Sequence, residues 1–437
     1  MIVEAKGNRR QRLANRLPFF YGWIIVLASF IATFVGGGMQ SFTFSIFMKP
    51  MTQELGWSRS AFTMALTMRT YAGAVMAPLF GAILDRHGPQ LLMFFSAVVG
   101  VIAAILLSRV GALWQFYIMY SLVGLIGGFG AGRLVIAATI PKWFVRLRGR
   151  AVAFASMGNA ASGAILAPFI AFVVVIVGWR MAWLAEGALF IVLIPMTLLM
   201  VRQPSDIGLL PDGAKSEEEV KAAESRRRGH SSAESFTLKE AMRTKAFWLL
   251  IVAHTIGSGP IGSVILHEYN FVTDEGFTPV LAAAVLSTHA TAASAARLVW
   301  GFMVERIHVR YCIALTYLGS AVGLMILLFA IWAHSALLLI LFGIVYGIHV
   351  GGNAVLGGVV TADYFGSESV GKIRGMMAPI QTILLGAGPL IVSLMYDSLG
   401  SYWIAFIGMV VMFIVGAVII SLATPPVKLT PSQASSG

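Results

Sequence analysis

The sequence between residues 402 and 423 is YWIAFIGMVVMFIVGAVIISLA, a run without a charged side chain. At about 1.5 Å per residue, a helix of this length crosses the roughly 30 Å hydrocarbon core of a bilayer. Eleven further apolar runs, separated by Gly, Pro and charged residues, precede it. The twelve runs are 21–47, 60–83, 90–108, 113–138, 149–177, 181–201, 246–270, 277–304, 310–332, 335–361, 373–396 and 402–423. The sequence therefore predicts an all-α membrane protein with twelve transmembrane helices.

The composition excludes several classes of protein. Of the 437 residues, 58% are hydrophobic and 11% are charged, whereas a soluble domain is about 25% charged. A disordered chain, a secreted disulfide scaffold and a cytosolic enzyme are thereby excluded. The single cysteine, Cys312, permits no internal disulfide and argues against a thiolate metal cluster. The sequence contains no GxxxxGK[ST], HExxH, CxxC or GxSxG motif, so we expect neither an enzyme nor a cofactor.

The basic residues gather on one side of the apolar runs. If the N-terminus is cytoplasmic, 24 of the 31 Lys and Arg residues lie in cytoplasmic segments, and four lie on the opposite side. This asymmetry is the orientation signal of membrane proteins, and it explains the net charge of +12 without a nucleic-acid partner. The N-terminus is basic and lacks a small-residue cleavage site, so we interpret the first run as an uncleaved span. We expect a multi-pass protein of the cell membrane with both termini cytoplasmic.

One long polar segment, residues 202–245, divides the spans six and six. It mixes acidic and basic clusters with Pro and Ser and is typical of a charged linker. The two halves then resemble each other at an offset of 220–222 residues. The matching features are Gly36, Gly37 and Gly38 with Gly257, Gly259, Pro260 and Gly262; Gly81-x3-Asp85-Arg86 with Gly301-x3-Glu305-Arg306; Trp143-Phe144 with Tyr364-Phe365; Ala167-Pro168 with Gly388-Pro389; and Gly178-Trp179-Arg180 with Gly400-Ser401-Tyr402.

Five matches in register indicate a duplicated six-span unit. We therefore expect an N-terminal six-helix bundle at 1–201, a cytoplasmic charged linker at 202–245 and a C-terminal six-helix bundle at 246–437. Parallel repeats of this kind are a transporter layout, with the substrate site near mid-membrane where the repeats meet.

The loop after the second span carries a known family pattern. Gly81-Ala-Ile-Leu-Asp85-Arg86-His-Gly88-Pro-Gln90 resembles the signature loop of the major facilitator superfamily, although that signature usually ends in a basic residue. A degenerate copy at 301–310 ends in Arg310 and has His308 in place of the second Gly. The resemblance implies the major facilitator fold and assigns Asp85, Arg86, Glu305 and Arg306 to cytoplasmic gates.

Shorter motifs are similar to the monocarboxylate porter branch, especially its oxalate/formate-antiporter-like members. They are Tyr21-Gly22-Trp23, Lys142-Trp143-Phe144, Arg148-Gly149-Arg150-Ala151, Asp206-Ile207-Gly208, Pro211-Asp212-Gly213 and Arg297-x3-Gly301. The resemblance implies that Arg297 binds a carboxylate. Two positions depart from the branch: Ala293 stands where proton-coupled members often have Asp, and Arg133 stands where many bacterial members have Tyr.

Three arginines fall inside predicted spans, while the nearest acids, Glu186 and Glu268, are expected towards the outer ends. A cation at mid-bilayer costs about 3 kcal/mol on insertion scales, and a substrate carboxylate matches the guanidinium fork bidentately. Arg297, about 6 Å along the helix from the second signature, is the first candidate; the alternative is a structural Arg that binds helix carbonyls.

Each of the other two arginines has two alternative roles. Arg133 follows a glycine run and is either a second carboxylate contact or a residue that reaches the headgroups; its counterpart in the tenth span is Asn353. Arg69 lies about 18 Å outward of Gly81. It either attracts anions in an outer vestibule or pairs with Glu186 or Glu268.

Neutral polar residues complete the predicted site. His289 lies two turns before Arg297 and could exchange a proton near neutral pH, although a packing role is the alternative for each intramembrane histidine. Asn159 and Gln381 occupy matching positions in the fifth and eleventh spans and could donate to substrate oxygens, or bond between helices.

These observations predict a secondary transporter of small organic anions, mono- or dicarboxylates, that works as an antiporter or a proton symporter. Its partners would be the carboxylate, a counter-anion or proton, and the lipid bilayer, with the protein a monomer. An inorganic anion porter of the nitrate type is the alternative cargo. A membrane receptor or regulator that does not transport, and uses the 202–245 linker to bind a partner, is the alternative class.

Overall fold

The computed structural model describes Gln11, Ala14 and residues 16–129, 133–220, 236–366 and 370–426. Every regular element in these residues is a helix, which confirms the all-α prediction. The elements of the first half are α2 (Gly22–Gly37), the π-helix η1 (Gly38–Phe42), α3 (Phe44–Leu55), α4 (Arg59–His87), α5 (Pro89–Ser108), α6 (Leu113–Phe129), α7 (Arg133–Trp143), α8 (Arg148–Val177), α9 (Trp179–Ile191) and α10 (Leu193–Leu199). Those that follow are η2 (Pro204–Ile207), η3 (Pro211–Gly213), α12 (Leu238–Met242), α13 (Lys245–Asp274), α14 (Pro279–Met303), α15 (Val309–Trp332), α16 (Ala336–Phe365), α17 (Val370–Leu399) and α18 (Trp403–Leu422).

Ten helices of the described chain are long and apolar enough to cross a membrane. The two remaining predicted spans are present as helices as well. The run 60–83 is part of α4, which carries Arg59, Arg69 and Arg86 and is therefore less apolar. The run 113–138 corresponds to α6 and α7, on either side of residues 130–132.

Contacts divide the chain into two compact units. The first comprises Met1–Gly229 with Ile265–Ser287, and the second comprises His230–Val264 with Thr288–Gly437. Helices α13 and α14 thus each contribute to both units. The domain boundaries expected from the sequence, at 201 and 246, stay a prediction.

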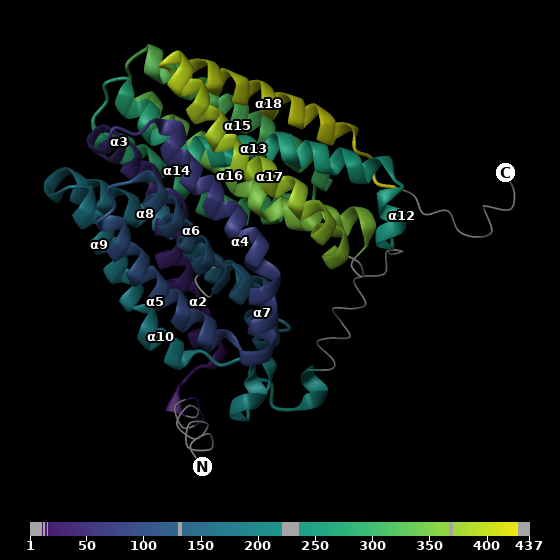
Figure 1. Cartoon of the computed structure of the whole chain (residues 1–437). Coiled ribbons are helices and arrows are strands. Elements are labelled where there is room, and N and C mark those ends of the chain that lie inside the picture. Colours follow the sequence, from purple (N-terminus) through teal and green to yellow (C-terminus); the bar gives the residue numbers. More distant parts are fainter. Residues whose placement is uncertain are drawn as a thin grey trace, which may run out of the picture. The chain divides into compact units, whose positions relative to one another are not determined.

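Glycines bring helices of the first unit close together. A methyl group added at Gly158 of α8 would overlap the carbonyl oxygen of Phe30 on α2, and one at Gly124 of α6 would overlap the carbonyl of Arg69 on α4. Helices α5 and α9 run side by side (Figure 1), with Gly187 of α9 against Ala104 of α5. Small residues at such contacts let backbones approach and gain packing energy in lipid.

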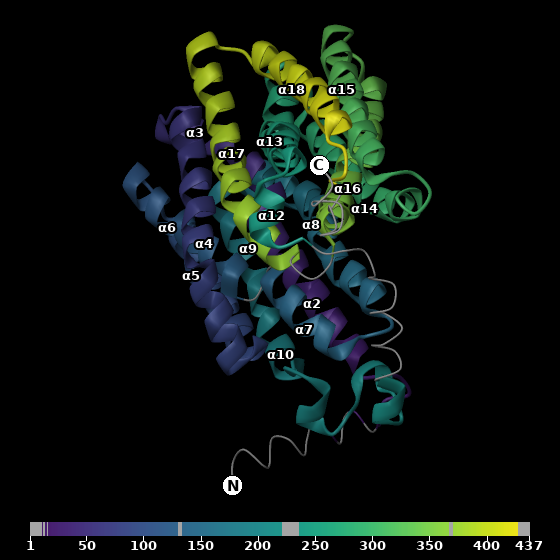
Figure 2. The same cartoon turned by 90° about the vertical axis from the view of Figure 1, so that its right-hand side faces the viewer.

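Glycines also bring helices of the second unit close together. Gly347 and Gly351 of α16 lie against the carbonyl groups of His289 and Ala293 on α14. Helix α15 packs on α16 and on α18, beside which it lies in Figure 2.

Equivalent contacts recur in the two halves. The indole N–H of Trp143 donates to the carbonyl oxygen of Val201 (3.1 Å), and the hydroxyl of Tyr364 donates to that of Ala423. These donors are 221 residues apart and their acceptors 222, so the repeat seen in the sequence is also a repeat of contacts. Gly124 against Arg69 and Gly347 against His289 form a second pair of this kind, which makes Arg69 and His289 equivalent positions.

The start of the linker is bound to the first unit. The carboxylate of Asp212, in η3, accepts hydrogen bonds from the backbone N–H groups of Val145 (2.9 Å), Arg146 (2.7 Å) and Leu147 (3.3 Å). These donors immediately precede α8, where unpaired N–H groups favour an anion. Asp212 therefore holds the α7–α8 connection to the linker.

Candidate functional site

The π-helix η1 interrupts the first span and collects polar side chains from other helices. Three successive carbonyl oxygens accept side-chain hydrogen bonds: Gly38 from the Thr43 hydroxyl (2.9 Å), Met39 from the Tyr120 hydroxyl (2.9 Å) and Gln40 from Nη1 of Arg69. A π turn changes the register of backbone hydrogen bonds and is often found at functional sites. Gly36 and Gly37 end α2, and Gly38 begins this π turn.

Arg69 lies beside this turn on α4. Its guanidinium carbon is 6.0 Å from the ring centroid of Tyr120, within range of a cation–π interaction. Its contacts are with a carbonyl and a ring, and it pairs with no carboxylate in the described part of the chain. No ion pair joins Arg69 to Glu186 or Glu268 among the described residues, and the role of Arg69 stays a prediction.

Glu186 of α9 also lies against this turn, next to Gly38, and is fully buried. Its Oε1 is 2.5 Å from Oγ1 of Thr43, and its Oε2 is buried without a hydrogen-bond partner among the described residues. The sequence led us to expect this acid towards an outer helix end. It instead belongs to the polar cluster around η1, together with Thr43, Tyr120 and Arg69.

Asn159 of α8 approaches the same segment. Its Oδ1 is 2.6 Å from the position that a methyl group on Gly37 would occupy. Arg69 and Asn159, two predicted site residues of the first half, thus both contact residues 37–40.

In the second unit, the predicted residues gather on α14 and α16. His289 is buried, with its ring centroid 4.9 Å from that of Tyr346. Arg297 lies two turns further along α14, half-buried, and Trp300 donates to the carbonyl oxygen of Ile348 on α16 (2.8 Å). Asn353 lies half-buried on α16, and its Nδ2 is buried without a hydrogen-bond partner among the described residues.

The remaining predicted residues are not gathered into a cluster. Gln381 lies half-buried on α17. Arg86, Glu305 and Arg306 are exposed, and none of them forms an ion pair within the residues that the structure describes. Arg133 begins α7 and Asp85 lies in α4, but their side chains are outside the described set.

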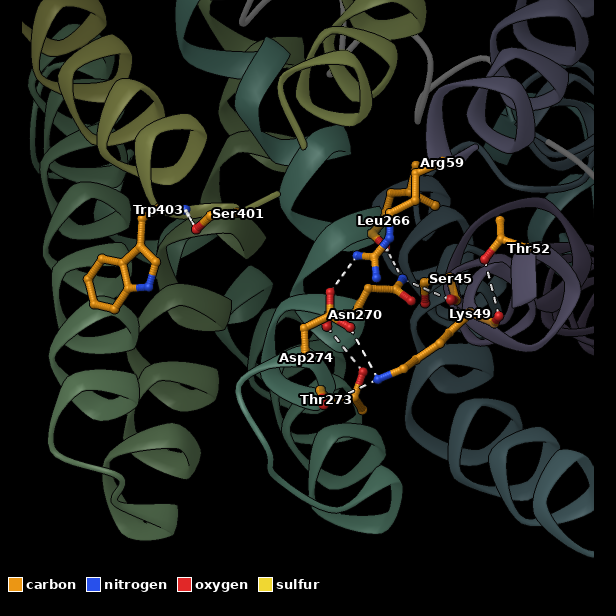
Figure 3. Close-up of polar contacts among 10 residues, drawn as sticks. All are labelled: Ser45, Lys49, Thr52, Arg59, Leu266, Asn270, Thr273, Asp274, Ser401 and Trp403. Atoms are coloured by element: carbon orange, nitrogen blue, oxygen red, sulfur yellow. Dashed lines mark hydrogen bonds and ion pairs between the residues drawn. The ribbon is translucent and has the colours of Figure 1, made fainter. Parts of the chain in front are cut away.

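A second polar cluster, not predicted from the sequence, joins α13 to α3 and α4 in the first unit. We call it the Asp274 clasp (Figure 3). The carboxylate of Asp274 lies 2.6 Å from Nη1 of Arg59 and 3.1 Å from Nζ of Lys49. Lys49 also donates to the carbonyl oxygen of Thr273 (3.3 Å), and Nδ2 of Asn270 donates to that of Ser45 (3.0 Å). Lys49 and Arg59 are two of the four cations expected outside the cytoplasmic face.

Comparison with known proteins identifies the family. The sequence profile of the Major Facilitator Superfamily matches residues 25–266 and again residues 256–436. The chain belongs to the major facilitator superfamily. It is therefore a multi-pass membrane transporter and not an enzyme, and the two matches together span residues 25–436.

Relatives within the major facilitator superfamily include proteins named for carboxylates. The chain is 26% identical to the oxalate:formate antiporter of Oxalobacter formigenes over 247 residues, which cover 56% of this chain and 53% of the antiporter. It is 24% identical to monocarboxylate transporter 2 of Rattus norvegicus over 403 residues, 87% of this chain and 78% of that protein. The resemblance to the monocarboxylate and oxalate/formate branch is thereby confirmed, while the antiporter is matched over only about half its length.

Solved major facilitator structures share the fold. A crystal structure of the D-xylose–proton symporter superposes with a TM-score of 0.71 at 15% identity, covering 93% of this chain and 98% of that chain. The inward-open xylose transporter XylE from E. coli gives 0.70 at 14% identity, covering 93% and 97%. At such low identity the likeness shows the fold alone, and it confirms the predicted fold class.

Proposed function

We propose that this protein is a secondary transporter of small organic anions, mono- or dicarboxylates, that works by alternating access. The observation that carries the proposal is a guanidinium group, Arg297, placed within α14, a helix apolar enough to span a membrane. The names of two relatives, an oxalate:formate antiporter and a monocarboxylate transporter, support a carboxylate as the cargo.

The chemistry of Arg297 explains how an anion would change the energy of the transporter. A guanidinium in an apolar span is costly, and a carboxylate satisfies it through two parallel N–H···O bonds. A ligand shifts a conformational equilibrium only by its difference in affinity between states. A carboxylate that neutralises Arg297 best in a closed cavity would favour that state and permit crossing.

We assign the other predicted residues to the same transport path. Arg133, Arg69, Asn159, Asn353, Gln381 and His289 are proposed to contact the anion or to order its surroundings in at least one state. Asp85, Arg86, Glu305 and Arg306 are proposed to act at the cytoplasmic gate. The Asp274 clasp is proposed as the gate on the opposite side, because it ties the α13–α14 hairpin to α3 and α4.

Counterflow in proteoliposomes tests the proposal. Liposomes loaded with an unlabelled carboxylate would be diluted into the same carboxylate in labelled form, with a panel of mono- and dicarboxylates and with nitrate. We expect rapid uptake of at least one carboxylate and competition by its close analogues. Exchange of nitrate alone would replace the cargo with an inorganic anion, and the absence of any anion exchange would refute the proposal.

A further inference from the structure

The two polar contacts of the Thr43 hydroxyl bear on whether Glu186 is protonated. Oγ1 of Thr43 lies 2.9 Å from the carbonyl oxygen of Gly38 and 2.5 Å from Oε1 of Glu186. A hydroxyl group has one hydrogen to donate, and a backbone carbonyl has none. Each contact has a hydrogen of its own when Glu186 is protonated and donates to Thr43, which in turn donates to Gly38, whereas an ionised Glu186 would have to share the single Thr43 hydrogen with that carbonyl.

The burial of Glu186 favours the same state. The residue is 0% exposed, and Oε2 has no hydrogen-bond partner in the described chain. A buried carboxylate needs a cation or several donors, and no ion pair to Glu186 is formed by the residues that the structure describes. A neutral carboxylic acid leaves a single carbonyl oxygen unsatisfied, which costs less than an unpaired charge.

The helices that pack most extensively against α9 in the described chain supply no competing charge at this depth. They are α2, α3, α5, α8 and α10, of which α2, α5 and α10 contain no ionisable side chain. In α8 the arginines 148 and 150 lie at least about 24 Å along the helix from Leu166, which is next to Gly38. In α3, Lys49 is held by Asp274, and Glu54 accepts from Trp179 (2.7 Å) and pairs with Arg180.

The cation nearest to this acid in the cluster is Arg69, and Tyr120 connects the two. Tyr120 contacts the ring of Trp183, one turn before Glu186, at 6.3 Å, and its own ring faces Arg69. Tyr120 therefore contacts both the helix of the acid and the arginine, and no ion pair joins Glu186 to Arg69 among the described residues.

The second half shows that the fold does not require an acid here. At the repeat offsets of 221 and 222, Val264 corresponds to Thr43 and Gly408 to Glu186. Two apolar residues occupy the equivalent positions in a half with the same helices. Helix packing alone therefore does not account for Thr43 and Glu186.

We propose that Glu186, with Thr43, is a proton-binding site of the first half, protonated in this conformation and deprotonated when the transporter exposes it to water on the other side. The step adds one proton to a carboxylate oxygen, forming the O–H bond directed at Thr43, and later returns that proton to water. This use of the site rests on the proposed anion transport. Binding of the proton adds one positive charge to the half that carries Arg69, and binding of an anion balances it, so one proton accompanies one negative charge.

Infrared spectroscopy tests the proton site by itself. The full-length protein in liposomes should show the carbonyl stretch of a protonated carboxylic acid, which disappears as pH rises. Glu186→Gln should remove this band, Thr43→Val should shift it because the acid loses its hydrogen-bond acceptor, and Glu54→Gln should leave it unchanged. A titrating band that persists in Glu186→Gln would overturn the proposal.

Accumulation of a transported carboxylate tests the coupling. For a one-to-one electroneutral symport, a gradient of one pH unit sustains about a tenfold accumulation of a monoanion, since each tenfold ratio is about 1.4 kcal/mol. We expect this accumulation in the wild type and in Glu54→Gln, and an accumulation ratio of about one in Glu186→Gln. Equal accumulation in Glu186→Gln and wild type, or none in a wild type that exchanges anions, would overturn the coupling. A wild type that moves no anion would refute the proposed function instead, and the infrared titration would still decide the proton site.

Discussion

Oδ2 of Asp274, the last residue of α13, lies 2.6 Å from Nη1 of Arg59, the first residue of α4. The same carboxylate lies 3.1 Å from Lys49 of α3, so one acid balances two cations. The Arg59 and Asp274 side chains are 11% and 17% exposed, which limits screening by salt. These ion pairs link the α13–α14 hairpin to the helices of the first repeat within one unit.

Asp274→Asn should loosen this hairpin. The variant keeps the size of the side chain but leaves Arg59 and Lys49 without their shared counter-charge. We expect a loss of about 1–2 kcal/mol, or roughly a five- to thirtyfold larger open population. A cysteine at Asn270, buried here, introduced in a Cys312→Ser background, should then react faster with a membrane-impermeant maleimide.

Glu54→Gln provides the matched control for the clasp. It removes a nearby α3 carboxylate that pairs with Arg180 but does not touch α13. The labelling rate of the Asn270 cysteine should stay at its starting value. If Asp274→Asn labels no faster than this control, the clasp does not hold the hairpin closed.

Arg297→Lys should impair carboxylate exchange. The ammonium keeps the charge but lacks the planar fork that binds both carboxylate oxygens. We expect at least about a tenfold loss in exchange rate at low substrate, equivalent to about 1.4 kcal/mol. Arg109→Lys, at an exposed residue at the end of α5, should exchange normally. Full activity of Arg297→Lys would argue against bidentate binding.

Gly158→Ala should destabilise the protein and Gly81→Ala should not, because only Gly158 lies at a close contact between helices. A methyl group at Gly158 meets the backbone oxygen of Phe30, whereas one at Gly81 meets nothing within 4 Å. Thermal unfolding in detergent should show Gly158→Ala destabilised by about 1–3 kcal/mol. Gly81→Ala should be as stable as the wild type or slightly more stable, since alanine is the better helix former. Equal stability of the two variants would show that α2 and α8 do not pack as described.

Asp212→Gly should destabilise the first unit. The backbone of Asp212 is left-handed, with φ of 57°, so glycine relaxes the backbone while removing the acceptor of three N–H groups. We expect a net loss of about 1–2 kcal/mol in the free energy of unfolding, measured by denaturation in detergent. Asp206→Gly, which removes an exposed carboxylate of the same linker, is the control. A stabilised Asp212→Gly would show that its hydrogen bonds contribute little.

The helices were predictable because each span is a long run of mainly apolar residues, and the repeat was predictable because Gly81-x3-Asp85-Arg86 and Gly301-x3-Glu305-Arg306 share their spacing. The polar cluster was not. A π turn has no sequence signature here, and Thr43 lies 143 residues before Glu186 in the chain. Asp274 was missed because it lies just beyond the predicted end of the seventh span, at 270. Arg69 was singled out as a buried charge, but its partner is a carbonyl, and carbonyls carry no sequence information.

The hydrogen bonds from Trp143 to Val201 and from Tyr364 to Ala423 bear on the origin of the two halves. An indole N–H in one half and a phenol O–H in the other donate to backbone carbonyls at equivalent positions. The hydrogen bond is therefore common to both halves, although the side chain that donates it differs. The relation between the two halves is thus clearer in the positions of their hydrogen-bond donors and acceptors than in the identity of their residues.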